Sequence, residues 1–188
     1  MLFGLSVTGS ERLPRAGAAV LVSNHASWLD PIILALALTR KPAFLAMEEL
    51  WRMPGVRLVM RAWRLAIPVH RETVDTAALR RGLQALKNGA LLIVFPEGGI
   101  SPDGHLRPFH RGAALLAARA QVPIVPIAIV GTGEALPLGR VIPRPRPVSV
   151  RIGTPIPAPG PTRDDLLHAS DQAASQIREL LERPPRER

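Results

Sequence analysis

The sequence SNHASWLDP, at residues 23–31, joins two apolar runs and decides how the chain around it folds. The run before it, 18–22, is continuously apolar and partly β-branched, which predicts a buried strand, and the run after it, 32–38, predicts a helix. Asp30 followed by Pro31 is typical of a helix start, with Asp at the N-cap and Pro at the first helical position. The histidine of this stretch therefore falls in a loop between strand and helix, where functional sites are commonly built.

Apolar strand patterns alternate with helical patterns along the rest of the chain. Further strands are predicted at 5–9, 43–47, 65–69, 90–95, 124–130 and 148–152, and helices at 48–64, 73–88, 112–121 and 161–182. Residues 183–188 are expected to form a frayed tail. This alternation predicts an α/β fold with a largely buried mixed sheet flanked by helices. A length of 188 residues predicts a single domain over 1–188.

The chain is strongly basic, with a formal net charge of +9, and all but two of its 24 basic residues are Arg. Arg suits bidentate binding of phosphate, so the charge indicates an anionic partner such as a phospholipid surface, a phosphorylated substrate or nucleic acid. A GC-rich coding sequence would produce the same composition. Three Trp, four Phe and no Tyr offer few platforms for base stacking, which argues against nucleic acid.

Several classes of protein are excluded by what the sequence lacks. There is no Cys, which rules out disulfides, thiolate catalysis and Cys-based metal sites. The histidines follow no zinc-ligand spacing, so neither a metal nor a cofactor is predicted. No apolar run approaches the roughly 18 to 20 residues that span a bilayer, so any membrane association is expected to be peripheral. One candidate for such contact is 48–64, where Trp and Met beside a row of Arg fit a membrane interface or an ordinary amphipathic helix.

His25 and Asp30 form the first candidate catalytic pair. On one continuous helix, residues five apart would point about 140° away from each other and could not touch. The pair therefore requires His25 to lie in the turn and Asp30 to open the helix. A carboxylate beside a histidine holds one tautomer and stabilises the imidazolium that forms as the ring takes a proton. Taken alone, the two residues favour a structural reading, in which Asp30 caps its helix and His25 satisfies the main chain of the turn.

Four further candidate residues stand at strand ends or at a helix start. Glu97 and Gly98 follow the most apolar strand, Arg71 follows the strand at 65–69, and Arg111 opens the helix at 112–121. Ligands in α/β proteins bind beyond the carboxyl ends of strands, and two Arg can clamp a phosphate. A tight turn and solvated surface groups would account for the same residues.

Four sequence blocks resemble the motif blocks of the glycerophospholipid acyltransferases, in particular the bacterial 1-acyl-sn-glycerol-3-phosphate (lysophosphatidic acid) acyltransferases. They are NHxxxxD at 24–30, PVHR at 68–71, FPEG at 95–98 and VPIVPI at 122–127. Four blocks in the right order are specific, whereas one block alone would be weak.

The resemblance implies an activity and a role for each candidate residue. The chain would transfer a fatty acyl group from acyl-CoA or acyl carrier protein to the hydroxyl of a lysophospholipid, giving phosphatidic acid from 1-acylglycerol-3-phosphate. It would do so peripherally, at the cytoplasmic face of a membrane. His25 would deprotonate the hydroxyl and Asp30 would orient the ring, while Arg71, Glu97 and Gly98 would bind the glycerol phosphate. Such an attack on a thioester needs a base but no protein nucleophile.

One departure from the family pattern affects the acceptor. The third block continues Gly-Ile-Ser where the family usually has Thr-Arg-Ser, so Ile100 replaces an Arg expected on the acceptor phosphate. Arg111 fits a basic position that often follows this block, and we expect it to take over. The change also leaves room for another lysolipid acceptor. A different class of function, a non-catalytic basic module that binds membrane or nucleic acid through 52–64 and 140–151, is the remaining alternative.

Overall fold

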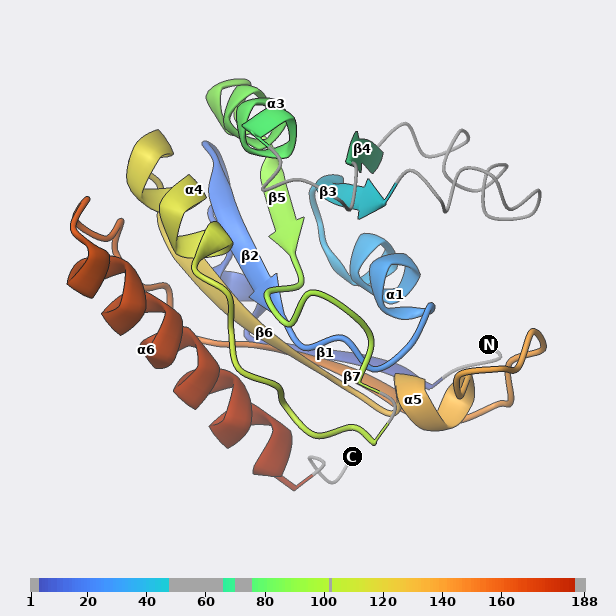
Figure 1. The fold of residues 1–188 in the computed structure, drawn as a ribbon. Helices are drawn as coiled ribbons and strands as arrows, with labels where there is room; N and C mark the ends of the chain where they lie inside the picture. The colour runs from blue at the N-terminus through green and yellow to red at the C-terminus, as the bar shows by residue number, and fades with distance from the viewer. Residues whose placement is uncertain (1–3, 48–65, 70–75, 102, 185–188) are drawn as a thin grey trace.

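The computed structural model describes residues 4–47, 66–69, 76–101 and 103–184 (Figure 1). The strands are Leu5–Thr8 (β1), Ala19–Ser23 (β2), Pro42–Met47 (β3), Ala66–Val69 (β4), Leu91–Val94 (β5), Ile124–Val130 (β6) and Val148–Ile152 (β7). The helices are Asp30–Ala37 (α1), Thr76–Lys87 (α3), Gly112–Ala120 (α4), Thr132–Ala135 (α5) and Arg163–Glu182 (α6), with a short 3-10 turn at Ser10–Arg12 (η1). In this part of the chain no helix is both long and apolar enough to cross a bilayer.

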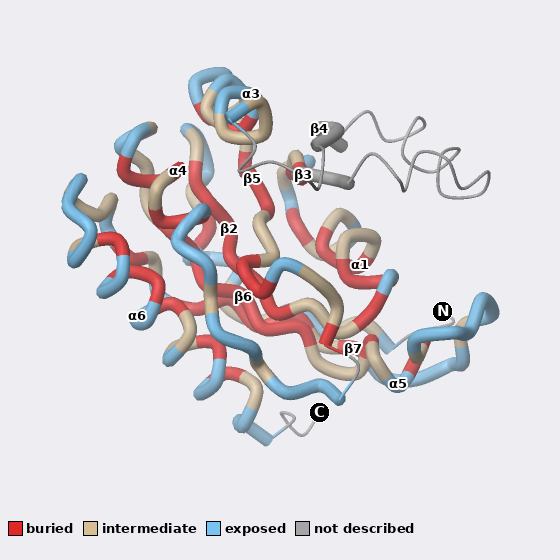
Figure 2. The backbone as a smooth tube through the Cα atoms, viewed as in Figure 1, coloured by how far each residue is buried: buried red, intermediate tan, exposed pale blue. Residues whose placement is uncertain are grey.

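The described strands form one seven-stranded sheet in the order β1-β7-β6-β2-β5-β3-β4. Neighbouring strands run parallel except β6 and β7, which are antiparallel, so the predicted mixed sheet is confirmed. The strand predicted at residues 5–9 is also confirmed as β1, at one edge of the sheet. The central strands β2, β5 and β6 are almost entirely buried (Figure 2).

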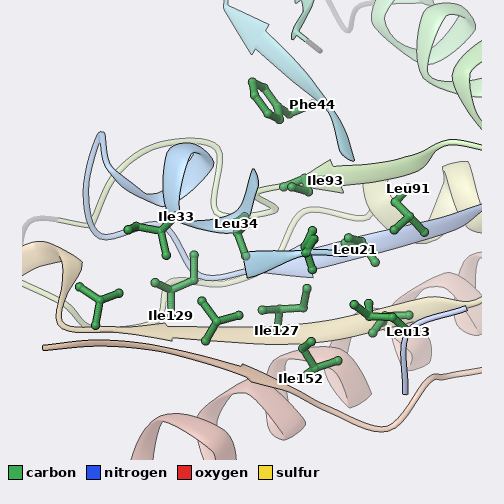
Figure 3. Packing of buried hydrophobic residues seen from close by; sticks show 14 of the residues in the cluster. Leu13, Leu21, Ile33, Leu34, Phe44, Leu91, Ile93, Ile127, Ile129 and Ile152 are labelled. Carbon is green, nitrogen blue, oxygen red and sulfur yellow. The ribbon is translucent and has the colours of Figure 1, made fainter. Parts of the chain in front are cut away.

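Successive residues of a strand point to opposite faces of the sheet, so continuously apolar strands make both faces apolar. Helices cover each of these faces. Leu21, Ile93 and Ile127 belong to one apolar cluster, which α1 covers (Figure 3). Val20 and Leu92 belong to the other cluster, which α3, α4 and α6 cover. These side chains are fully buried, and each stabilises the fold by about 1.5 to 3 kcal/mol relative to exposure.

The helix predicted at 161–182 is confirmed as α6. Its first turn is held by a capping box, in which Thr162 Oγ1 accepts the Asp165 N–H and the Asp165 carboxylate accepts the Thr162 N–H. The prediction for the short helix α1 is wrong in one respect, because Asp30 is its first residue rather than its cap. Its carboxylate turns back to N–H groups of the preceding loop instead of those of its own helix. The helix predicted at 48–64 lies outside the described residues.

Candidate active site

The candidate site lies at the carboxyl ends of β2, β5 and β6. The chain leaves β2 for α1, which packs on one face of the sheet, and leaves β5 for α4, which packs on the other. A ligand crevice is expected where neighbouring parallel strands continue to opposite faces. The first and third sequence blocks meet at this point.

Asn24 fixes the start of the loop that carries His25. Its side-chain amide donates to the Ile129 carbonyl at 2.9 Å, and its side-chain oxygen accepts the Ile129 N–H at 2.8 Å. The pairing of β2 with β6 ends at Ser23, so the buried Asn24 side chain replaces the next step of the ladder. In the sequence Asn24 stands only as a turn-favouring residue of the first block, and its two bonds to Ile129 have no local signal.

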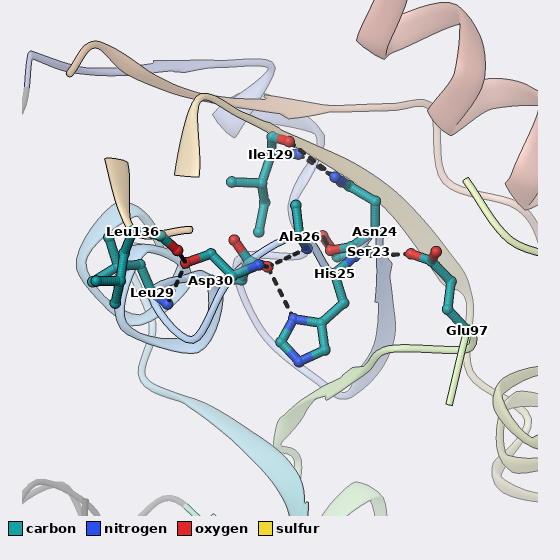
Figure 4. Close-up of polar contacts among 10 residues, drawn as sticks. Ser23, Asn24, His25, Ala26, Leu29, Asp30, Glu97, Ile129 and Leu136 are labelled. Atoms are coloured by element: carbon teal, nitrogen blue, oxygen red, sulfur yellow. Dashed lines mark hydrogen bonds and ion pairs between the residues drawn. The ribbon is translucent and has the colours of Figure 1, made fainter. Parts of the chain in front are cut away.

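His25 and Asp30 are brought together as the sequence predicted. His25 Nδ1 lies 2.9 Å from Asp30 Oδ2, which also accepts the Ala26 N–H at 2.7 Å and the Ser27 N–H at 2.8 Å (Figure 4). An ionised carboxylate oxygen can only accept, so this contact requires the hydrogen on Nδ1, and a neutral ring then has its lone pair on Nε2. In Figure 4 the second ring nitrogen points away from the carboxylate. The Asp30 side chain is fully buried, whereas His25 retains 13% of its side-chain exposure.

The His25 ring is also held from its face. It stacks on Phe95, the first residue of the third block, with ring centroids 4.1 Å apart and planes 19° apart. Stacking on one face and a hydrogen bond at Nδ1 together restrict rotation of the ring. His25 Nε2 therefore points in one fixed direction, and it makes no hydrogen bond to any of the described residues.

The third block clamps the main chain of His25 on both sides. Glu97 Oε1 accepts the His25 N–H at 2.8 Å, and the Ser101 N–H donates to the His25 carbonyl at 2.8 Å. Glu97 Oε2 accepts the Arg107 N–H at 3.0 Å, which closes the loop between the third block and α4. Burial raises the pKa of Glu97 above its usual range, against the lowering effect of the N–H donors of Arg107 and His25.

Gly98 occupies a position that only glycine fits well. Its φ is +73°, and a Cβ placed there would lie 3.3 Å from the His110 ring. The His110 N–H donates to the Pro96 carbonyl at 2.9 Å, so the third block and the start of α4 form one closed loop. Arg111 follows His110 as the N-cap of α4 and is exposed, with its side chain available at a helix N-terminus.

Helix α5 supports the site from the other side and was missed by the sequence analysis. Ser27 Oγ donates to the Leu136 carbonyl at 2.8 Å, and a Cβ on Gly133 would lie 3.5 Å from the Ala26 Cβ. A helix of four residues makes only about one turn, which is too short to show a helical repeat in the sequence.

The structure thus brings together His25, Asp30, Glu97 and Gly98, with Arg111 next to the closed loop. Arg71 lies outside the described residues. Within the described ranges there is no group of three or more His, Asp or Glu side chains that could hold a metal ion.

Comparisons with known proteins identify the family and several relatives of the chain. Residues 4–130 match the family model described as Acyltransferase. The chain is 37% identical over 138 residues to the chloroplastic 1-acyl-sn-glycerol-3-phosphate acyltransferase BAT2 of Brassica napus, a match that covers 71% of this chain and 39% of that protein. It is 25% identical over 182 residues to the 1-acyl-sn-glycerol-3-phosphate acyltransferase of Bacillus subtilis, covering 94% of this chain and 88% of that one.

A solved structure is similar over nearly the whole chain. The crystal structure of the 1-acyl-sn-glycerophosphate (LPA) acyltransferase PlsC from Thermotoga maritima matches 98% of this chain and 75% of that one, with a TM-score of 0.79 and 32% identity. By contrast, the chain spans only about two fifths of the length of plant relatives such as the Brassica protein.

Proposed function

Because the chain belongs to the acyltransferase family, we propose that it transfers a fatty acyl group from a thioester donor to the free hydroxyl of a lysophospholipid. The donor is acyl-CoA or acyl carrier protein, and the acceptor is 1-acylglycerol-3-phosphate, which gives phosphatidic acid in phospholipid biosynthesis. The named specificity of the relatives supports this acceptor. The proposed substrates carry phosphate groups or an acidic surface, which suits a chain with a net charge of +9. The chain is proposed to work peripherally, at the cytoplasmic face of a membrane.

The observation that carries the proposal is the 2.9 Å contact between His25 Nδ1 and Asp30 Oδ2. In the proposed reaction Nε2 takes the proton of the acceptor hydroxyl while the oxygen attacks the thioester carbonyl. The buried carboxylate stabilises the imidazolium formed in this step. The C–S bond then breaks, and the leaving thiolate recovers the proton from His25. The products are an ester and a thiol, and the protein is unchanged.

The acceptor phosphate is proposed to lie against Arg71 and Arg111. Arg111 is exposed at the N-terminus of α4, where unpaired N–H groups and the helix dipole also favour an anion. Glu97 and Gly98 complete the acceptor subsite. Since both Glu97 oxygens accept main-chain N–H groups, the glutamate contributes by holding the loop in shape, and Gly98 by leaving space for the glycerol phosphate.

A second candidate keeps the chemistry and changes the acceptor. Ile100 stands where the family usually places an Arg on the phosphate, which favours a lysolipid that carries less negative charge. The two candidates differ only in what the hydroxyl is attached to.

Offering one thioester donor with a panel of lysolipids tests both candidates. Lysophosphatidic acid is expected to be acylated fastest, as measured by released thiol and by mass spectrometry of the product. Faster transfer to an acceptor without a phosphate monoester would overturn the proposed acceptor, and no transfer to any acceptor would overturn the activity.

Replacing His25 with Ala tests the base. This variant is expected to fold and to lose transfer, whereas His168→Ala, an exposed histidine on α6, serves as the matched control and keeps it. Arg71→Ala is expected to raise the KM for the acceptor while the KM for the donor stays unchanged. An unaltered acceptor KM in that variant would remove Arg71 from the phosphate subsite.

A further inference from the structure

The segment between α5 and β7, residues 136–147, presents apolar side chains to solvent. Val141 is 90% exposed and Ile142 is 76% exposed, which are the highest values for large apolar side chains among the described residues. Leu138 is 42% exposed in the same segment. Figure 1 shows this segment looping outward beyond α5, and Figure 2 shows it exposed along most of its length. Such a cluster on a surface marks an interaction site.

The segment 136–147 is held at its base. The Arg144 N–H donates to the Ala135 carbonyl at 2.7 Å, which closes the outward loop, and the Arg140 N–H donates to the Pro137 carbonyl at 3.1 Å. Four prolines in the segment, at 137, 143, 145 and 147, have no N–H to donate. Three of the eight main-chain N–H groups in the segment, those of Leu136, Arg140 and Arg144, are hydrogen-bonded within the protein. The other five need water or lipid headgroups as partners, which keeps the main chain of the segment at the level of the headgroups.

The charged residues within the segment 136–147 are all positive. Arg140, Arg144 and Arg146 are exposed, and the sequence has no acidic residue between Glu134 and Asp164. Apolar side chains at the tip with cations beside them are the arrangement that binds an interface of acyl chains and anionic headgroups.

We propose that residues 136–147 dock on an anionic lipid surface. Val141, Ile142 and Leu138 enter the boundary between headgroups and acyl chains, and the three Arg bind lipid phosphates. The docking names the part of the described chain that meets the lipid. Its role in catalysis rests on the proposed function.

The segment is joined directly to the candidate site. Leu136, at its start, accepts the hydrogen bond from Ser27 Oγ at 2.8 Å, and Ser27 lies in the loop between His25 and Asp30. Trp28, the next residue, is 41% exposed, as suits an aromatic ring at a membrane interface. Lipid docking therefore brings the His25 loop to the surface in which a lysolipid hydroxyl resides.

Sedimentation with vesicles, without any acyl donor, tests the docking. The chain is mixed with vesicles of phosphatidylcholine alone or of equal parts phosphatidylcholine and phosphatidylglycerol. We expect preferential binding to the anionic vesicles and a fall in partitioning of at least about tenfold in Val141→Ser/Ile142→Ser. Replacing the three Arg by Gln is expected to weaken binding by about fivefold per Arg, with less dependence on salt. The matched controls, with unchanged binding, are Leu167→Ser and the triple Gln variant of Arg119, Arg163 and Arg178.

Several results would overturn the docking. They are no vesicle binding by the unaltered chain, equal binding by Val141→Ser/Ile142→Ser, or an equal loss in the Leu167→Ser control. A dimer in solution that this double substitution dissociates would assign the segment to a second copy instead.

Kinetics separate failure of the docking from failure of the proposed function. Transfer by Val141→Ser/Ile142→Ser is expected to fall for an acceptor embedded in vesicles and to stay unchanged for a short-chain acceptor dissolved as monomers. Vesicle binding that depends on the segment, in a chain that acylates nothing, would refute the proposed function and leave the docking in place. Normal transfer from vesicles by this variant would refute the docking alone.

Discussion

Replacing Asp30 with Asn removes one buried negative charge while keeping the size of the side chain and one acceptor oxygen. In the structure that charge lies 2.9 Å from His25 Nδ1, and Asp30 is fully buried. Opposite unit charges about 4 Å apart attract by about 4 kcal/mol at an effective dielectric constant of about 20. The imidazolium that forms during proton transfer loses this attraction in Asp30→Asn. We therefore expect the rate of acyl transfer to fall about 10³-fold.

The same variant is expected to remain folded. The Asn oxygen can still accept the N–H groups of Ala26 and Ser27 and the His25 ring N–H, which now donate to a neutral group. Each such bond is weaker by about 1 kcal/mol, so the three together cost about 3 kcal/mol of unfolding free energy. The Asn amide nitrogen takes the place of Asp30 Oδ1, which is buried without a partner among the described residues, and its unpaired donors add a cost of about 1 to 3 kcal/mol. Burial of a neutral amide in place of a charge offsets part of that loss.

The assay measures kcat from thiol release and the unfolding free energy from urea titration. Leu166→Ala in α6 is the matched control, because removing this buried side chain costs about 2 to 5 kcal/mol away from the site. Its kcat is expected to be unchanged. A folded Asp30→Asn chain whose kcat stays within about tenfold of the unaltered chain would refute the electrostatic reasoning. Equal losses of kcat in both variants would reduce the role of Asp30 to stability.

Three further predictions concern the groups that position His25. Asn24→Ala leaves the N–H and the carbonyl of Ile129 unpaired, so urea titration should give an unfolding free energy lower by about 2 to 5 kcal/mol; an unchanged midpoint would contradict this. Gly98→Ala forces φ of +73° on alanine beside the His110 ring, at a cost of about 1 to 2 kcal/mol and a lower Tm; equal Tm values would show that the loop adapts. Burial raises the pKa of Glu97, so its contribution to stability is full below its unfolded value of 4.5 and is lost as pH rises through the raised folded pKa. Across that window the unaltered chain should lose stability relative to Glu97→Gln, and a constant difference would argue against the raised pKa.

Local patterns were sufficient to predict most of the fold. The buried strands β2, β5 and β6 are short continuous apolar runs. The capped, amphipathic helix α6 is long enough to repeat its apolar pattern over several turns. The pairing of His25 with Asp30 was also predictable, because only one short loop separates His25 from Asp30 at the start of α1. The order of the strands and the reversal of β7 against β6 had no local signal in the sequence.

The rest of the site depends on contacts between distant parts of the chain. The two bonds from Asn24 to Ile129 and the acceptance of the His25 N–H by Glu97 appear only after β2 has paired with β6 and β5. The sequence placed Glu97 on the substrate, whereas in the structure both its oxygens accept main-chain N–H groups. Its proposed part in the acceptor subsite is therefore to hold the loop in shape.

The clamp on the His25 main chain has a kinetic consequence. The Glu97 bond closes a separation of 72 residues, and the Asn24 bonds to Ile129 close one of 105 residues. Contacts this distant in sequence form slowly, because the entropy of loop closure is lost before the contact rewards it. During refolding, helical circular dichroism should therefore recover before catalysis does. A nascent chain released before β6 has emerged would contain both His25 and Asp30 and still lack the geometry that makes them a catalytic pair.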